Sequence, residues 1–109
     1  SGDEWAAYVR RLEPEQISTL FKHNLPAELL TAFLVALDEH FFPEKAERAL
    51  AVLFALRRAG RFSILTMCLD KADTKAITSI FGKLSDACAS DVLSITAEEL
   101  HTLQREYSG

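Results

Sequence analysis

The stretch that decides the fold is residues 59–69, AGRFSILTMCL, which follows a long helical pattern. Gly60 suits the left-handed position that ends a helix, so we expect the preceding helix to stop there. On a helix over 61–69, helical spacing divides the remaining side chains between two faces. Phe62, Leu65 and Leu69 share one face, Arg61, Ile64 and Cys68 share the other, and Met67 lies between them.

A helix that is apolar nearly all round is usually buried in a larger core. This chain of 109 residues is too small to wrap many helices completely, so one apolar side can remain open for a partner. Complete burial of the segment is the other interpretation, and a buried strand is a third, because periodicity alone cannot type a short apolar run. The open interpretation predicts a partner-binding site at Arg61, Ile64, Met67 and Cys68.

The rest of the chain also has helical periodicity, and prolines or capping residues separate the apolar runs. Asp70 with Asp73, and Thr96 with Glu99, have the spacing of capping boxes. We expect helices at about 3–12, 14–21, 26–42, 43–59, 61–69, 71–84 and 97–107. The expected core residues are Trp5, Val9, Leu12, Ile17, Leu20, Phe21, Leu29, Leu30, Phe33, Leu34, Leu37, Ala46, Leu50, Leu53, Phe54, Leu56, Ile77, Ile80, Phe81, Leu84, Leu100 and Leu103. The sequence therefore predicts an all-α fold, a compact single domain of about seven short helices.

Two connections are less regular than the helices that they join. Asn24 is a candidate cap for the third helix, with Pro26 near its first turn. The stretch 85–95 is rich in polar and small residues, and we expect Val92, Leu93 and Ile95 to anchor it to the core.

Composition places the chain among single soluble globular domains, because 49% of its residues are hydrophobic and 26% are charged. The net charge of −4 argues against nucleic-acid binding, and no apolar run is long enough to cross a membrane. With two cysteines and no disulfide framework, a cytoplasmic location is expected. Ser1-Gly2 has the form of a scar from a cleaved expression tag. We therefore expect residues 3–109 to form one protein-docking domain, and the natural chain to extend further toward its N-terminus.

Few residues of the chain are arranged in patterns typical of catalytic, metal-binding or phosphate-binding sites. His23, His40 and His101 are not spaced as metal ligands, and no glycine-rich loop is present to hold a phosphate. Cys68 has no adjacent basic residue that would activate its thiol. We therefore expect no catalytic, cofactor-binding or metal site and no enzymatic activity. A small hydrolase or thiol enzyme would instead require a perturbed Cys68 or histidine.

Four groups of residues carry a resemblance to a known family. They are Leu20-Phe21, Leu25 and Leu29-Leu30; then Leu53, Leu56 and Gly60-Arg61-Phe62; then Asp70-Lys71-Ala72-Asp73, Ile77, Ile80-Phe81 and Leu84; and finally Leu100, Leu103, Arg105 and Tyr107. In this order they resemble the C-terminal helical domain of the RNA polymerase II-associated protein 3 family. That family includes sperm-associated antigen 1 and coiled-coil domain-containing protein 103.

The resemblance implies an adaptor in a heat-shock protein 90 co-chaperone that helps to assemble large complexes, such as RNA polymerase or the axonemal dynein arms of cilia. In the family this domain docks onto a RuvB-like AAA+ ATPase, here RuvB-like 2 by expectation, and other domains recruit heat-shock protein 90. The family's docking residues are similar to Arg61, Ile64 and Cys68. In the polymerase-associated relative, the position of Cys68 can carry a larger apolar or aromatic group. Self-association, or binding of a dynein-assembly factor without the ATPase, is the alternative.

Overall fold

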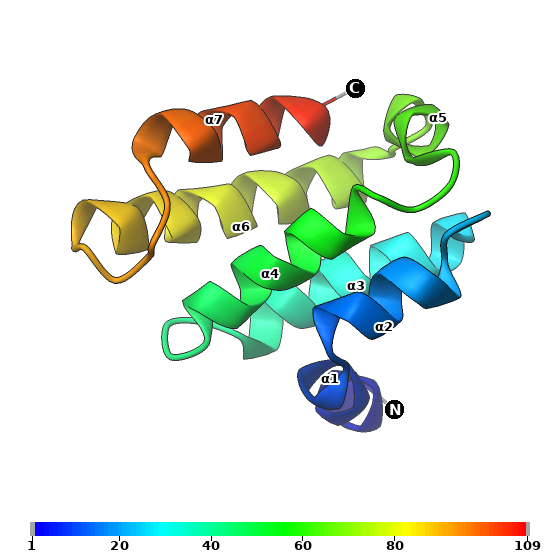
Figure 1. Cartoon of the computed structure of the whole chain (residues 1–109), viewed down its shortest axis with the longest axis horizontal. Coiled ribbons are helices and arrows are strands. Elements are labelled where there is room, and N and C mark those ends of the chain that lie inside the picture. Colours follow the sequence, from blue (N-terminus) through cyan, green and yellow to red (C-terminus); the bar gives the residue numbers. More distant parts are fainter. Residues whose placement is uncertain (1, 109) are drawn as a thin grey trace.

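The computed structural model describes residues 2–108, without the side chains of residues 2, 3 and 6. Ser1, half of the predicted tag scar, lies outside the described residues. Seven helices and no strand make up the described part: α1 (Gly2–Arg11), α2 (Pro14–Leu20), α3 (Ala27–His40), α4 (Ala46–Leu56), α5 (Phe62–Met67), α6 (Lys71–Ala89) and α7 (Ala97–Glu106). The predicted all-α class is therefore confirmed. In Figure 1, α6 and α7 lie side by side above α3 and α4. Helix α2 lies to the right of α4, α1 lies at the bottom, and short α5 sits at the upper right.

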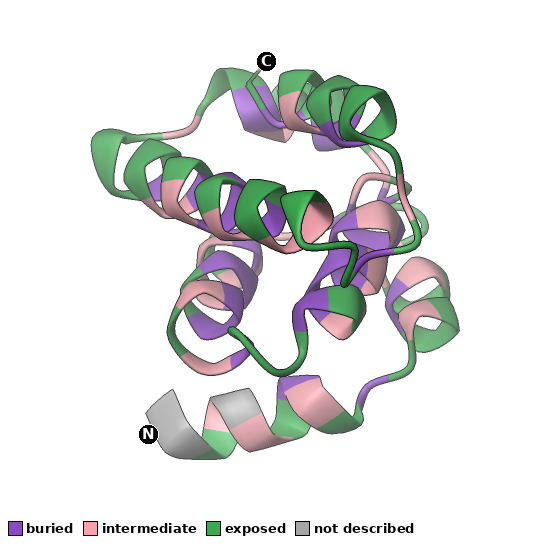
Figure 2. Ribbon diagram, turned by 90° about the vertical axis from the view of Figure 1, so that its left-hand side faces the viewer, coloured by how far each residue is buried: buried purple, intermediate pink, exposed green. Residues whose placement is uncertain are grey.

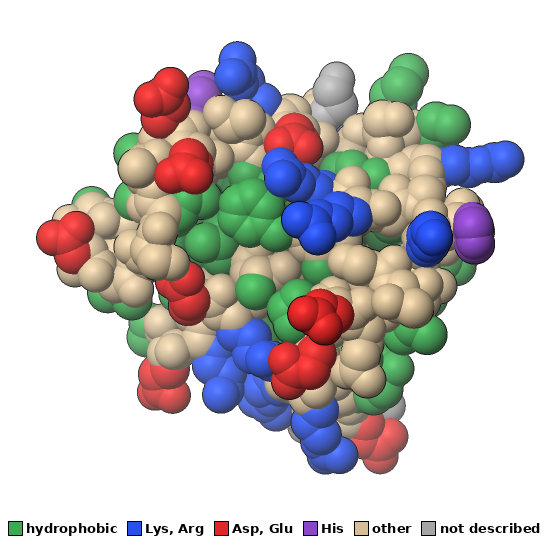
Figure 3. Space-filling view, viewed as in Figure 1, with side chains coloured by type: hydrophobic (Ala, Val, Ile, Leu, Met, Phe, Trp, Pro, Cys, Tyr) green, Lys and Arg blue, Asp and Glu red, His purple; other side chains and the backbone are tan. Residues whose placement is uncertain are grey.

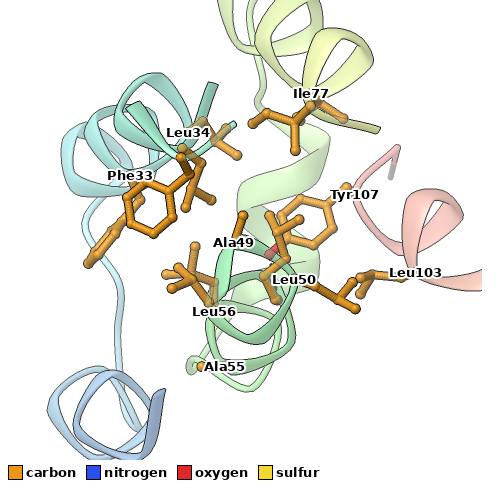
Figure 4. Packing of buried hydrophobic residues seen from close by; sticks show 14 of the residues in the cluster. Phe33, Leu34, Ala49, Leu50, Ala55, Leu56, Ile77, Leu103 and Tyr107 are labelled. Carbon is orange, nitrogen blue, oxygen red and sulfur yellow. Dashed lines mark hydrogen bonds between the residues drawn. The ribbon is translucent and has the colours of Figure 1, made fainter. Parts of the chain in front are cut away.

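The core lies between α3, α4, α6 and α7 and forms where the apolar stripes of these helices meet. Figure 2 shows the buried residues on the sides of the helices that face the interior, and Figure 4 shows side chains of α3, α4, α6 and the chain end converging. Most of the predicted core residues are buried. Trp5, Phe21, Leu29 and Phe54 are partly buried against the core. Leu20 is the wrong prediction: it is 59% exposed, because no helix packs over that side of α2.

Helix starts follow local side-chain chemistry at two predicted caps. The Asp70 carboxylate accepts from the Asp73 backbone N–H at 2.8 Å, and the Thr96 hydroxyl accepts from the Glu99 N–H at 3.1 Å. Both capping boxes are complete, since the side chains of Asp73 and Glu99 in turn accept from the backbone N–H of their cap residues. Asn24, in contrast, is not a cap: Pro26 occupies that position of α3, and no side chain caps the helix.

The structure corrects both ends of one predicted helix and the C-terminal end of another. The helix expected over 43–59 is shorter, Ala46–Leu56, because tighter turns follow it, with Arg58 N–H donating to Ala55 O at 3.1 Å. The helix expected over 71–84 is longer and runs to Ala89, since its small residues continue to pack against the core. In the following turn Leu93 is buried as expected and Ile95 is partly buried, but Val92 is 60% exposed and anchors nothing.

The C-terminal end of the described chain is fastened by Tyr107. Its phenol is buried, donates to the Leu53 carbonyl oxygen at 2.6 Å, and packs against the rings of Phe62 and Phe81. Burial raises the pKa of Tyr107 well above its ordinary value of 10.0. The approach of Arg57 partly opposes this shift. One side chain thus ties α7 to α4, α5 and α6.

Tyr107→Phe should lower the free energy of unfolding by about 1 kcal/mol near neutral pH, because a buried hydrogen bond is lost. The loss should shrink in alkali. Since the folded-state pKa is raised, unfolded tyrosine ionises first, so the stability that Tyr107 contributes is present below pH 10 and declines as the pH rises towards the folded value. Urea unfolding of both proteins at about pH 8 and about pH 11 measures this. An equal difference at both values would contradict the burial of a neutral phenol.

Candidate functional site

The segment before α5 is shaped by a close backbone approach. Gly60 donates its N–H to the Phe21 carbonyl at 3.0 Å, and a Cβ at Gly60 would lie 2.2 Å from the backbone oxygen of His23. The left-handed residue is Arg61, with φ 64°, and not Gly60 as predicted. Glycine is therefore needed at 60 for space, while the turn into α5 is made one residue later.

Helix α5 presents two different faces. It covers Phe62–Met67, shorter than the predicted 61–69, and Phe62 and Thr66 are its buried residues. Leu65 and Leu69 are partly buried against the core. On the other side Ile64 is 56% exposed, Met67 is 78% exposed, and Arg61 and Cys68 are exposed.

We call Arg61, Ile64, Met67 and Cys68 the α5 patch. All four predicted partner-binding residues lie on the outside of one short segment, so complete burial and a buried strand are both wrong. Figure 3 shows hydrophobic side chains protruding at the corner of the molecule where Figure 1 places α5. Exposed apolar side chains grouped in this way are typical of an interaction surface.

A cleft of about 490 Å³ lies beside the α5 patch and is lined by side chains from α5, the end of α4 and the end of α7. Arg57 and Glu106 close one side through an ion pair of 2.6 Å. Arg61 and Arg105 also line the cleft, and neither makes an ion pair within residues 2–108. The edge of the patch is therefore positively charged.

Sequence reasoning missed the contribution of Arg57 and Arg105 to this cleft. The two residues are far apart in the sequence, and the fold brings the ends of α4 and α7 to the same cleft. The pairing of Arg57 with Glu106 leaves the cleft with two guanidinium groups that are free to meet a partner's carboxylates.

The histidines and cysteines are dispersed. His23 and His101 are exposed and His40 is partly exposed, while the Cys88 thiol donates to the Ile95 carbonyl at 3.4 Å. No group of three or more His, Cys, Asp or Glu residues in the described part of the chain is arranged to hold a metal ion. No described helix is both long and apolar enough to span a bilayer.

Known proteins share the sequence pattern and the helical arrangement of this chain. A protein-family model described as the potential Monad-binding region of RPAP3 matches residues 1–74. The chain belongs to this family. The NMR structure of the C-terminal domain of human RPAP3 has the same fold as this RPAP3 family member, with a TM-score of 0.86 over 100% of this chain and 77% of that chain, at 18% sequence identity. No curated protein matches the sequence. The description of the family is that of a potential binding region.

Arg61→Gly should raise the free energy of unfolding of this RPAP3 family member by about 0.5–1 kcal/mol. A left-handed conformation costs a non-glycine residue about 1–2 kcal/mol, and the greater freedom of unfolded glycine offsets part of that gain. Arg58→Gly is the matched control, because Arg58 is exposed and does not have positive φ. The free energy of unfolding of the Arg58→Gly protein should therefore fall. Thermal and urea unfolding measure both. A destabilised Arg61→Gly protein would show that the Arg61 side chain supports the fold.

Proposed function

We propose that this domain docks onto a RuvB-like AAA+ ATPase, with RuvB-like 2 as the expected paralogue, through the α5 patch. It would act as the adaptor end of a heat-shock protein 90 co-chaperone that supports assembly of dynein arms or RNA polymerase. The observation that carries the proposal is the outward side of α5, where Ile64 and Met67 are exposed in a domain of a binding-region family. Heat-shock protein 90 would be recruited by other parts of such a co-chaperone.

The mechanism rests on preorganisation. Phe62 and Thr66 hold α5 against the core, so the outward side chains are positioned before the partner arrives. A preformed surface loses little conformational entropy on binding. Burying Ile64 and Met67 supplies the apolar contribution, about 1.5–3 kcal/mol for each side chain at most. Arg61 and Arg105 then face carboxylates at the rim, where charge fixes orientation and speeds association.

The test is a titration of purified RuvB-like ATPase with this domain, comparing the wild type with Arg61→Glu. The variant should bind about a hundredfold more weakly, because a carboxylate would face the partner's acidic rim. It should keep its helical content and melting temperature, since Arg61 is exposed and both side chains meet the same left-handed backbone cost.

Two further variants make the result specific. Met67→Ser removes the most exposed apolar side chain of the patch without changing charge, and it should weaken binding by about tenfold. Arg11→Glu makes the same charge change on α1, away from α5 in Figure 1, and should bind like the wild type. Equal binding by wild type and Arg61→Glu would refute the docking face.

A second candidate partner comes from the family description, which names Monad. The same variants should be titrated against Monad. Binding of Monad but not of the ATPase, lost in Arg61→Glu, would keep the α5 patch and change the partner. A self-associating domain, the remaining alternative, would instead sediment as a larger species at higher concentration, and Met67→Ser would return it to a monomer.

A further inference from the structure

A second hollow lies at the opposite end of the domain from the α5 patch. It has a volume of about 520 Å³ and is formed by the end of α3, the turn into α4 and the last turns of α6. We call it the α3–α6 groove, defined by Glu39, Phe42, Ala46, Asp86, Ala87 and Val92. Figure 1 shows these segments at the left and α5 at the right, and Figure 2 looks onto the groove's end of the molecule. The function proposed for α5 makes no use of this groove.

The floor of the groove is apolar and made of small side chains. Ala46 is buried and Ala87 is partly buried, and both line the hollow of about 520 Å³, which has room for a larger side chain from outside. Phe42 and Val92 line the same space, and Val92 is 60% exposed although its backbone is fixed by a hydrogen bond to Ala87 O at 3.0 Å. An exposed valine over an alanine floor leaves apolar area that a partner side chain can cover.

The wall of the groove is held in place before any partner binds. Lys83 donates to the Asp38 carboxylate at 2.8 Å and to the Asp38 carbonyl at 2.8 Å. The same ammonium lies 5.5 Å from the centre of the Phe42 ring. Asp38 also accepts from the Ser79 hydroxyl at 2.7 Å. These contacts neutralise Asp38 and Lys83 within the fold and fix the position of the Phe42 ring.

The remaining charge around the groove is negative. Glu39 and Asp86 are exposed at its rim, and neither makes an ion pair within the described chain. Both α3 and α6 end here, and the C-terminal ends of helices carry partial negative charge. Acidic side chains also occupy the left edge of Figure 3, where α6 ends. The groove is therefore complementary to a cation that carries an apolar group.

We propose that the α3–α6 groove binds a basic segment of a second partner protein, which inserts an aliphatic side chain over Ala46 and Ala87 while its flanking lysines or arginines meet Glu39 and Asp86. Because the groove and the α5 patch lie at opposite ends, both can be occupied at once. The domain would then hold two proteins together and not bind only one.

The test selects displayed random short peptides on the immobilised domain and then measures the enriched sequences in solution. Peptides with an aliphatic residue between lysines or arginines should be enriched. Their binding should fall about tenfold in Glu39→Lys/Asp86→Lys, which places like charges together. Ala87→Trp, which fills the groove, should bind as poorly. Glu15→Lys/Glu28→Lys is the matched control, because it makes the same charge change on exposed residues of α2 and α3 outside the groove.

Amide chemical shifts of the labelled domain locate the peptide. Changes should concentrate on residues 38–46 and 83–92, and Arg61→Glu should bind the peptide like the wild type. The proposal is overturned if no basic sequence is enriched, if both double variants lose binding alike, or if a serine in place of the aliphatic residue binds equally well. Shift changes in the groove on simple dilution of the free domain would assign the surface to a second copy of this chain and would also overturn it.

Discussion

Phe33→Ala should lower the free energy of unfolding by about 3–5 kcal/mol, the range measured when large buried aromatic residues are truncated. Phe33 is fully buried, and its ring meets Trp5 at 5.2 Å and Phe21 at 6.0 Å between ring centres. These three rings join α1, α3 and the end of α2. The cavity would therefore open where three segments meet, and none of them can close it without leaving its other contacts.

Trp5 reports this loss directly, because it is the single tryptophan of the chain and its indole donates to the Ala32 carbonyl at 2.9 Å. Its fluorescence should shift to longer wavelength in folded Phe33→Ala, as α1 loosens from α3. Val35→Ala on the same helix is the control: Val35 is exposed, so the change should cost under about 0.5 kcal/mol. Similar costs for both variants in urea unfolding would place the core elsewhere.

Gly60→Ala should cost about 2–4 kcal/mol, although only a methyl group is added. The new Cβ would meet His23 O at 2.2 Å and His23 C at 2.3 Å, and both are backbone atoms that cannot rotate away. Separating the two segments would also break the hydrogen bond from Gly60 N–H to Phe21 O. Denaturant unfolding measures the cost, and binding by the α5 patch should weaken as well, because α5 begins two residues later.

Gly82→Ala is a sharp comparison for this prediction. Gly82 lies within α6, and a Cβ there would meet nothing within 4 Å. Alanine is a better helix former, so this change should raise the free energy of unfolding by about 0.5–1 kcal/mol. Opposite signs for the two glycines would confirm that contact with His23 sets the requirement at Gly60. A neutral Gly60→Ala would refute the close approach.

Features decided by neighbours in the chain were predictable from sequence. The Asp70 and Thr96 capping boxes depend on residues three positions apart, and both formed. The two faces of α5 followed from helical spacing, so the exposure of Ile64 and Met67 agrees with the prediction. The docking role of those residues remains a prediction.

Features decided by distant segments were not predictable. Gly60 was correctly singled out but for the wrong reason, because its requirement comes from the His23 backbone and not from its own φ. Leu20 has the periodicity of a core residue and Val92 was expected to anchor an irregular stretch, yet both are exposed. The cleft beside α5 combines Arg57 with Arg105, and no local pattern pairs them.

Helix α5 buries Phe62 and Thr66 and partly buries Leu65, so its outward side chains contribute little to the stability of the domain. Substitutions at Ile64, Met67 or Cys68 should therefore change what the domain recognises while leaving its stability almost untouched. A lineage can explore new partners at such positions without passing through unfolded intermediates. We expect the scaffold residues around Phe33 and Tyr107 to change slowly over evolution and the outward residues of α5 to diversify first.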